Sequence, residues 1–143
     1  MTFETADLRT PDSVVDAVYR ILSGRADEPR DWAGLETLCV PGARLIGVSV
    51  VDGLVVAETL DIVAYARSRA PLLASNDFYE RDVRRRVDQS GNIAHVWSVY
   101  EARRSPDGPA FMHGVGSFQL LRRNDRWRIM SAMWQAAPEQ LGS

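Results

Sequence analysis

The second half of the chain follows a period of two, and this pattern restricts the fold more than any other feature. Four such segments occur in succession, separated by short turns that are rich in Gly, Asp, Asn, Ser and Pro. Neighbouring strands joined by short turns pair antiparallel. The pattern therefore predicts an antiparallel meander, with strands at about 77–88, 92–104, 110–122 and 126–136.

The first half carries helical spacing and helix caps instead. Thr10, followed by Pro11, is expected to cap a first helix, Asp31 a second short helix, and Thr59 a third. We expect the third helix to end at Pro71 or at the Leu72-Leu73 pair. Before the third helix, RLIGVSV and VDGLVVA predict a hairpin around Asp52-Gly53. Helices followed by a meander indicate the α+β class, in which a curved antiparallel sheet is wrapped around N-terminal helices.

Length, charge and cysteine content narrow the class of protein. A chain of 143 residues fits a single domain, 1–143 with a core at about 11–136, that can bury its core without disulfides. The net charge of −2 favours neither nucleic acid nor an anionic membrane as a partner. The lone Cys39 is typical of a reducing, cytoplasmic protein, and no apolar run has the length of a membrane helix.

The choice of basic residues limits the chemistry. All 17 are arginines, which excludes a phosphate-binding lysine, a lysine Schiff base and a lysine general base. Two histidines and one cysteine are too few for an ordinary zinc site. We therefore expect no metal and no cofactor, and any acid–base chemistry must use histidine, carboxylates, tyrosine or arginine.

Two predicted registers gather polar side chains on one face of the sheet. A three-residue loop at 89–91 would set Arg85 opposite His95. In the next hairpin, one register sets Glu101 opposite His113 and His95 opposite Gln119. The shared face would then contain Tyr79, His95, Trp97, Glu101, His113, Ser117 and Gln119.

This face has two interpretations. It can line an apolar cavity with convergent polar groups, as small-molecule sites do. Alternatively, it can be the outer face of the sheet, covered by a second copy of the chain, because three helices cover only one face; we therefore expect a homodimer joined through the sheet. Glycines at 114 and 116 leave one face bare, where a helix or a ligand can come close.

The face that the last strand presents to the cavity depends on its turn. A two-residue turn at Asn124-Asp125 would point Trp134 toward the cavity, whereas a three-residue turn would choose Trp127. Tyr19 on the first helix either points its hydroxyl into the cavity or belongs to the core.

Several long segments resemble the nuclear transport factor 2-like superfamily, also called SnoaL-like. They are SVVDAVYRILSG, DWAGLETLCVPGARLIG, FYERDVRRRV, GNIAHVWSVYEARR and RWRIMSAMWQ, which occur in the order of the family's elements between about 12 and 135. The resemblance implies a cone-shaped α+β fold with an internal pocket. The superfamily contains isomerases, dehydratases, cyclases, epoxide hydrolases and non-catalytic binding domains, so fold does not choose among them.

Two positions depart from the members that resemble ketosteroid isomerase. The first strand, from Arg44 to Val48, lacks their general-base aspartate, and Gln119 stands near the position of their carboxylic acid. The departures argue against steroid isomerisation. By analogy with dehydratases of the superfamily, we expect catalytic His95, His113, Glu101 and Tyr79, and an apolar small molecule bound by Tyr19, Trp97, Ser117, Gln119 and Trp134. The alternative is a non-catalytic dimeric domain that binds a ligand or a protein.

Overall fold

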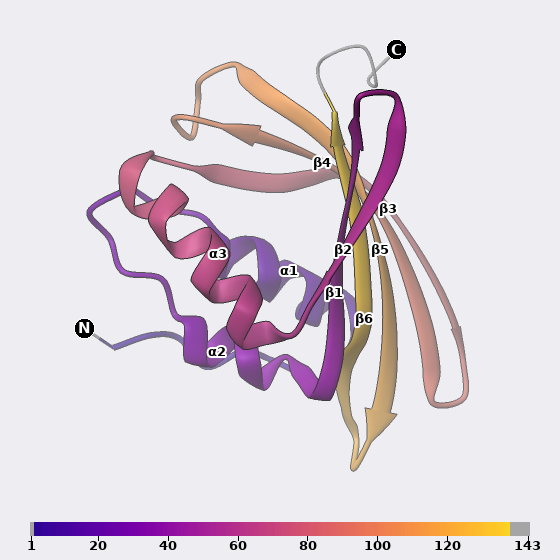
Figure 1. Ribbon diagram of the computed structural model, residues 1–143. Helices are drawn as coiled ribbons and strands as arrows, with labels where there is room; N and C mark the ends of the chain where they lie inside the picture. The colour runs from indigo at the N-terminus through magenta and orange to yellow at the C-terminus, as the bar shows by residue number, and fades with distance from the viewer. Residues whose placement is uncertain (1, 138–143) are drawn as a thin grey trace.

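The computed structural model describes residues 2–137 and confirms the α+β class. One strongly curved sheet of six strands wraps around three helices, which all lie on its concave side (Figure 1). Among the described residues, no helix is long and apolar enough to cross a membrane. The elements are α1 (Pro11–Leu22), α2 (Trp32–Thr37), β1 (Cys39–Val51), β2 (Leu54–Leu60), α3 (Ile62–Ser75), β3 (Tyr79–Ser90), β4 (Ile93–Arg103), β5 (Ala110–Arg123) and β6 (Arg126–Ala137).

Helix α1 begins where the sequence predicts, for local reasons. Thr10 and Ser13 form a capping box: the Thr10 hydroxyl accepts from the Ser13 N–H at 3.0 Å, and the Thr10 N–H donates to the Ser13 hydroxyl at 3.2 Å. Pro11 occupies the first helical position, where no N–H is needed. The helix then buries one apolar face against the sheet, through Val14, Val15, Ala17, Tyr19, Ile21 and Leu22.

Two predicted boundaries were wrong. Asp61, not Thr59, caps α3, because β2 continues through Leu60 in its pairing with β1, and the Asp61 carboxylate accepts from the Ala64 N–H at 2.7 Å. Helix α3 also passes Pro71 and ends at Ser75. A proline inside a helix removes one hydrogen bond but does not oblige the helix to end.

The sheet has the order β2-β1-β6-β5-β4-β3, in which β1 pairs parallel to β6 and the other pairs are antiparallel. The predicted β1–β2 hairpin and the predicted four-stranded antiparallel meander are therefore confirmed. In the β5–β6 hairpin, Asn124 and Asp125 have φ of 55° and 60° and form the two-residue turn.

The two registers that defined the polar face had different outcomes. In the β4–β5 pair, Glu101 lies opposite His113 and His95 opposite Gln119, as predicted. In the β3–β4 pair, Ser90 opposes Ile93, so that the turn has two residues and Asp88, not Arg85, opposes His95. A register shift between Asp82 and Arg84 follows farther along β3.

Trp127 and Trp134 both point to the concave side, although seven residues apart they should lie on opposite faces of a regular strand. The reason is a register shift between Gln119 and Leu120, which pair with Ser131 and Ile129 of β6. The extra residue on β6 reverses the alternation. Trp127 is thereby buried in the core, and Trp134 lies among the side chains that border the cavity described below.

Candidate functional site

A cavity of about 370 Å³ lies between the helices and the concave face of the sheet. This volume is in the range of small-molecule sites, and most of the lining is apolar. The lining includes Val18, Tyr19 and Leu22 of α1, Tyr65, Arg69, Leu72 and Leu73 of α3, Glu80 of β3, Tyr100 of β4, Gly116 and Phe118 of β5, and Ile129, Ala132 and Trp134 of β6.

Glycines on β5 leave room on this side of the sheet. A Cβ atom at Gly114 would collide with the ring of Tyr100, and a Cβ atom at Gly116 would come within 3.2 Å of the Phe118 ring. Gly116 lines the cavity directly. The bare face that the sequence predicts is therefore the cavity face, where the glycines make room for the rings of Tyr100 and Phe118.

Glu80 is the carboxylic acid of the cavity lining. Its backbone is fixed to the end of α1, because its N–H donates to the Ser23 hydroxyl at 2.9 Å. Burial among apolar side chains raises the pKa of Glu80 to about 8, although the positive charge of Arg69 acts in the opposite direction. At neutral pH this group is mainly protonated, and so it can donate a proton and take one back.

Three tyrosines line the same cavity as this carboxyl. Burial raises the pKa of Tyr65 to about 12 and raises the pKa values of Tyr19 and Tyr100 as well, so all three stay protonated at neutral pH. The rings of Tyr19 and Tyr100 lie 6.3 Å apart, and Tyr65 meets Trp134 edge-on at 5.5 Å. The three tyrosines thus contribute neutral hydrogen-bonding groups to an otherwise mostly apolar wall.

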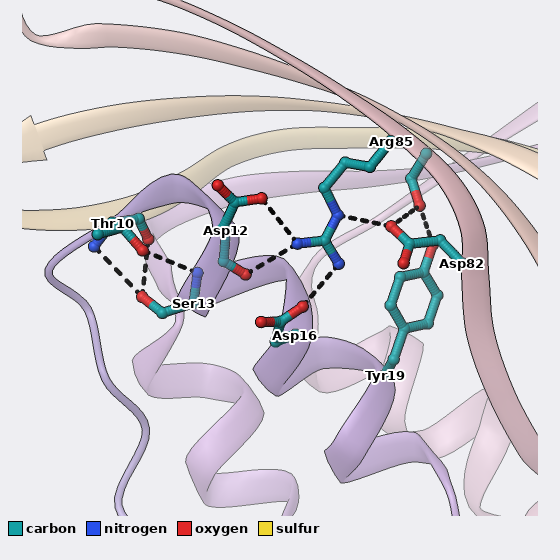
Figure 2. Close-up of polar contacts among 8 residues, drawn as sticks. Thr10, Asp12, Ser13, Asp16, Tyr19, Asp82 and Arg85 are labelled. Carbon is teal, nitrogen blue, oxygen red and sulfur yellow. Dashed lines mark hydrogen bonds and ion pairs between the residues drawn. The ribbon is translucent and has the colours of Figure 1, made fainter.

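A buried polar network holds Tyr19 in place (Figure 2). Its hydroxyl lies 2.6 Å from Ser98 Oγ, and Ser98 donates to Asp82 Oδ2 at 2.9 Å. Because a serine has one hydroxyl proton and Ser98 gives it to Asp82, Tyr19 must donate to Ser98. The lone pairs of Tyr19 then stay available as acceptors, and its proton is committed to the network.

Arg85 extends this network to α1. It donates to Asp82 through Nε at 2.6 Å, to Asp12 through Nη1 at 3.0 Å and to Asp16 through Nη2 at 2.7 Å (Figure 2). Arg85 lies on the concave side of β3, whereas its neighbours Arg84 and Arg86 lie on the convex side. This guanidinium fastens β3 to α1, the two elements that carry Glu80 and Tyr19.

The sequence-predicted site residues divide between the two faces. Tyr19 and Trp134 line the cavity. The others do share one face, but the expectation that it lines the cavity was wrong: it is the convex face, away from the helices. These residues are Tyr79, His95, Trp97, Glu101, His113, Ser117 and Gln119.

On the convex face, the polar residues bind one another. His95 Nε2 lies 2.9 Å from Ser117 Oγ. Glu101 forms ion pairs with Arg81 and Arg103, and the hydrogen bond from Arg103 lowers the pKa of its carboxyl. Glu101 does lie opposite His113 in the β4–β5 pair, but its carboxylate forms ion pairs with arginines.

Four lining residues were not predicted from the sequence: Tyr65, Arg69, Glu80 and Tyr100. One signal could have found two of them, since the face opposite to the histidines carries the glycines of β5, and Tyr100 and Glu80 share that face through the β4 pairings. The other two, Tyr65 and Arg69, lie on α3, and no sequence pattern marked which side of that helix faces the sheet. Among residues 2–137, no group of three or more His, Cys, Asp or Glu side chains could hold a metal ion.

No protein-family model and no curated protein matches the chain in sequence. Solved structures do match in fold. A protein of unknown function with a cystatin-like fold from Nostoc punctiforme has a TM-score of 0.68 at 9% identity, with 90% of this chain and 89% of that chain covered.

Two further structures have names that state an activity. A proposed dehydratase of the NTF2-like family from Streptomyces avermitilis has a TM-score of 0.61 at 19% identity, covering 90% of this chain and 99% of that one. A proposed ketosteroid isomerase from Shewanella frigidimarina has a TM-score of 0.56 at 15% identity, covering 85% and 90%. At these identities the likeness concerns the fold alone: the chain has the cystatin-like fold of the nuclear transport factor 2-like proteins.

Proposed function

We propose that the chain binds a small, largely apolar molecule in the cavity and that Glu80 is its acid–base group. The observation that carries this proposal is the position of the Glu80 carboxyl in the lining of a mostly apolar cavity, where burial raises its pKa to about 8. A group that titrates near the working pH serves well as both acid and base.

Cofactor-independent dehydration, isomerisation or cyclisation suits this arrangement. Protonated Glu80 can protonate a leaving hydroxyl or a carbonyl oxygen, and its conjugate base can take a proton from carbon. Tyr65 and Tyr100 can donate hydrogen bonds to an oxygen that becomes negative. The proposed dehydratase and isomerase activities of two structural neighbours support this class of reaction, but through the fold alone.

A neutral dye tests the binding part of the proposal. Nile red should bind with saturation, and Ala132→Leu should weaken binding because Ala132 lines the cavity and is buried. Met133→Leu is the matched control, since Met133 is the next residue on β6 and is exposed. Equal affinities of the two variants for Nile red would contradict a ligand site in the cavity.

Kemp elimination of 5-nitrobenzisoxazole tests the acid–base part. Ionised Glu80 would take the ring proton from carbon, the C–H electrons would form the nitrile, and the N–O bond would break to leave a phenolate. The rate should rise with pH through about 8, the pKa of Glu80, and Glu80→Gln should abolish it. Glu101→Gln, on the convex face, is the control; unchanged turnover by Glu80→Gln would refute the role of Glu80.

The second candidate is a non-catalytic binding domain that acts as a homodimer. The observation in its favour is the apolar surface on the convex face and in the β1–β2 hairpin, which projects beyond the helices (Figure 1). Exposed members include Val50, Leu54, Val55, Ile93, Trp97 and Met133. Nile red binding without any acceleration of the Kemp reaction would favour this candidate over the enzyme.

A further inference from the structure

Arg69 is a charged residue in the apolar cavity, and among residues 2–137 it has no oppositely charged partner. It lies on α3, is partly buried and lines the cavity beside Tyr65 and Trp134. Its guanidinium carbon is 5.0 Å from the centre of the Tyr65 ring and 5.8 Å from that of Trp134. Two aromatic faces therefore hold the guanidinium at the cavity wall, but they do not neutralise it.

The contrast with Arg85 shows what is missing. Arg85 is also largely buried, and Asp12, Asp16 and Asp82 all pair with it. Among residues 2–137, no carboxylate forms an ion pair with Arg69, whose Nη1 donates to the Ser68 hydroxyl at 3.0 Å. A partly buried charge without a counter-ion costs free energy, which a bound anion would offset.

The other ionisable groups of the lining do not supply that anion. Glu80 is mainly protonated at neutral pH, as described above, and the tyrosines are neutral. Arg104, at the edge of the cavity, adds a second positive charge. The lining is therefore positive as well as apolar, which favours a ligand with an apolar body and a negative end.

We propose that the ligand is an apolar monocarboxylate and that Arg69 binds its carboxylate. This inference rests on the proposed function, since it names the class of ligand for the same cavity. A guanidinium presents a planar fork of N–H donors that matches a carboxylate in two parallel hydrogen bonds. Of the two arginines in the lining, only Arg69 is partly buried, whereas Arg104 is exposed and stacks on the Phe111 ring. One partly buried positive charge is balanced by one negative charge, so a monocarboxylate fits better than a dianionic phosphate.

Calorimetry with two matched probes at neutral pH tests the proposal. Naphthalene-2-carboxylate and naphthalene-2-carboxamide share a ring system and differ in charge. The wild-type protein should bind the carboxylate about tenfold more tightly, the value expected of one charge-assisted hydrogen-bonded pair. Arg69→Gln should bind the two probes equally, whereas Arg67→Gln, on the exposed side of the same helix, should keep the tenfold preference.

The outcomes separate this inference from the proposed function. Equal binding of both probes by the wild-type protein would overturn the inference and leave the cavity site intact. No binding of either probe would overturn both. Arg69→Lys keeps the charge but not the planar fork of donors, so its preference for the carboxylate probe should be reduced. Thermal unfolding would check that both Arg69 variants are folded. A full tenfold preference in both Arg69 variants would overturn the assignment of Arg69.

Discussion

Nε of Arg85 lies 2.6 Å from Oδ2 of Asp82, and only 16% of each side chain is exposed. Through the same guanidinium, Asp12 and Asp16 of α1 are tied to β3. One arginine thus compensates the charge of the buried Asp82 and links the helix that carries Tyr19 to the strand that carries Glu80.

Replacing this arginine should destabilise the fold. Arg85→Met would leave Asp82 buried without its counter-ion, and we expect a loss of about 3 kcal/mol in the free energy of unfolding. Arg86→Met is the matched control: Arg86 is the next residue, pairs with Asp88 in an exposed ion pair at 3.2 Å, and should cost less than about 0.5 kcal/mol. Urea denaturation measures both, and similar losses would contradict the role given to Arg85.

Stability should fall with rising pH because of Glu80. Its pKa is raised from 4.5 to about 8 on folding, so between these values the native state holds a proton that the unfolded state releases. The stabilisation of the native state by this proton is complete below pH 4.5 and is lost as pH rises through about 8. The slope is at most about 1.4 kcal/mol per pH unit. In urea titrations at several pH values, Glu80→Gln should flatten this slope; an unchanged slope would contradict the raised pKa.

Ligand binding should depend on the concave face and not on the convex one. His95→Gln should leave the affinity for Nile red unchanged, because His95 pairs with Ser117 outside the cavity. Trp134→Ala should weaken that affinity about tenfold through lost aromatic contact. Fluorescence titration gives both values, and weaker binding by His95→Gln alone would restore the pocket role that the sequence suggested.

The convex face should join two copies of the chain. Trp97 is 43% exposed there, and Ile93 and Met133 flank it on the same face. Burial of this face would supply the roughly 800 Å² per partner of a standard interface. Trp97→Glu should give a monomer in sedimentation at micromolar concentration. Val63→Glu, at an equally apolar exposed site on α3, should stay dimeric; a monomeric wild type would refute the prediction.

The sequence predicts the fold well because its signals are local. The capping box of Thr10 and Ser13, the period-two strands and the Asn124-Asp125 turn each act within a few residues. The predicted bounds of the four meander strands agree with β3 to β6 to within about two residues at each end. Local signals failed at the start of α3, because the pairing of Leu60 with Leu45 extends β2 past Thr59, the predicted cap.

The site was less predictable because β4 is apolar on both faces. A period of two says which residues share a face, and His95, Glu101, His113 and Gln119 do share one. The same pattern does not indicate which face of the sheet packs against the helices. The register shift near Gln119 also reverses the alternation of β6, an effect that no local pattern marked. Glu80 and Arg69 meet only through tertiary packing.

The proposed acid–base role depends on the pKa of the Glu80 carboxyl in the folded protein, and ¹³C NMR of the glutamate side-chain carboxyls measures this pKa directly. The Glu80 resonance, identified by its absence in Glu80→Gln, should titrate with a midpoint of about 8 because the carboxyl is buried in the apolar cavity. A midpoint near the ordinary value of 4.5 would show a hydrated, ionised carboxylate at neutral pH and would contradict the proposed acid–base role.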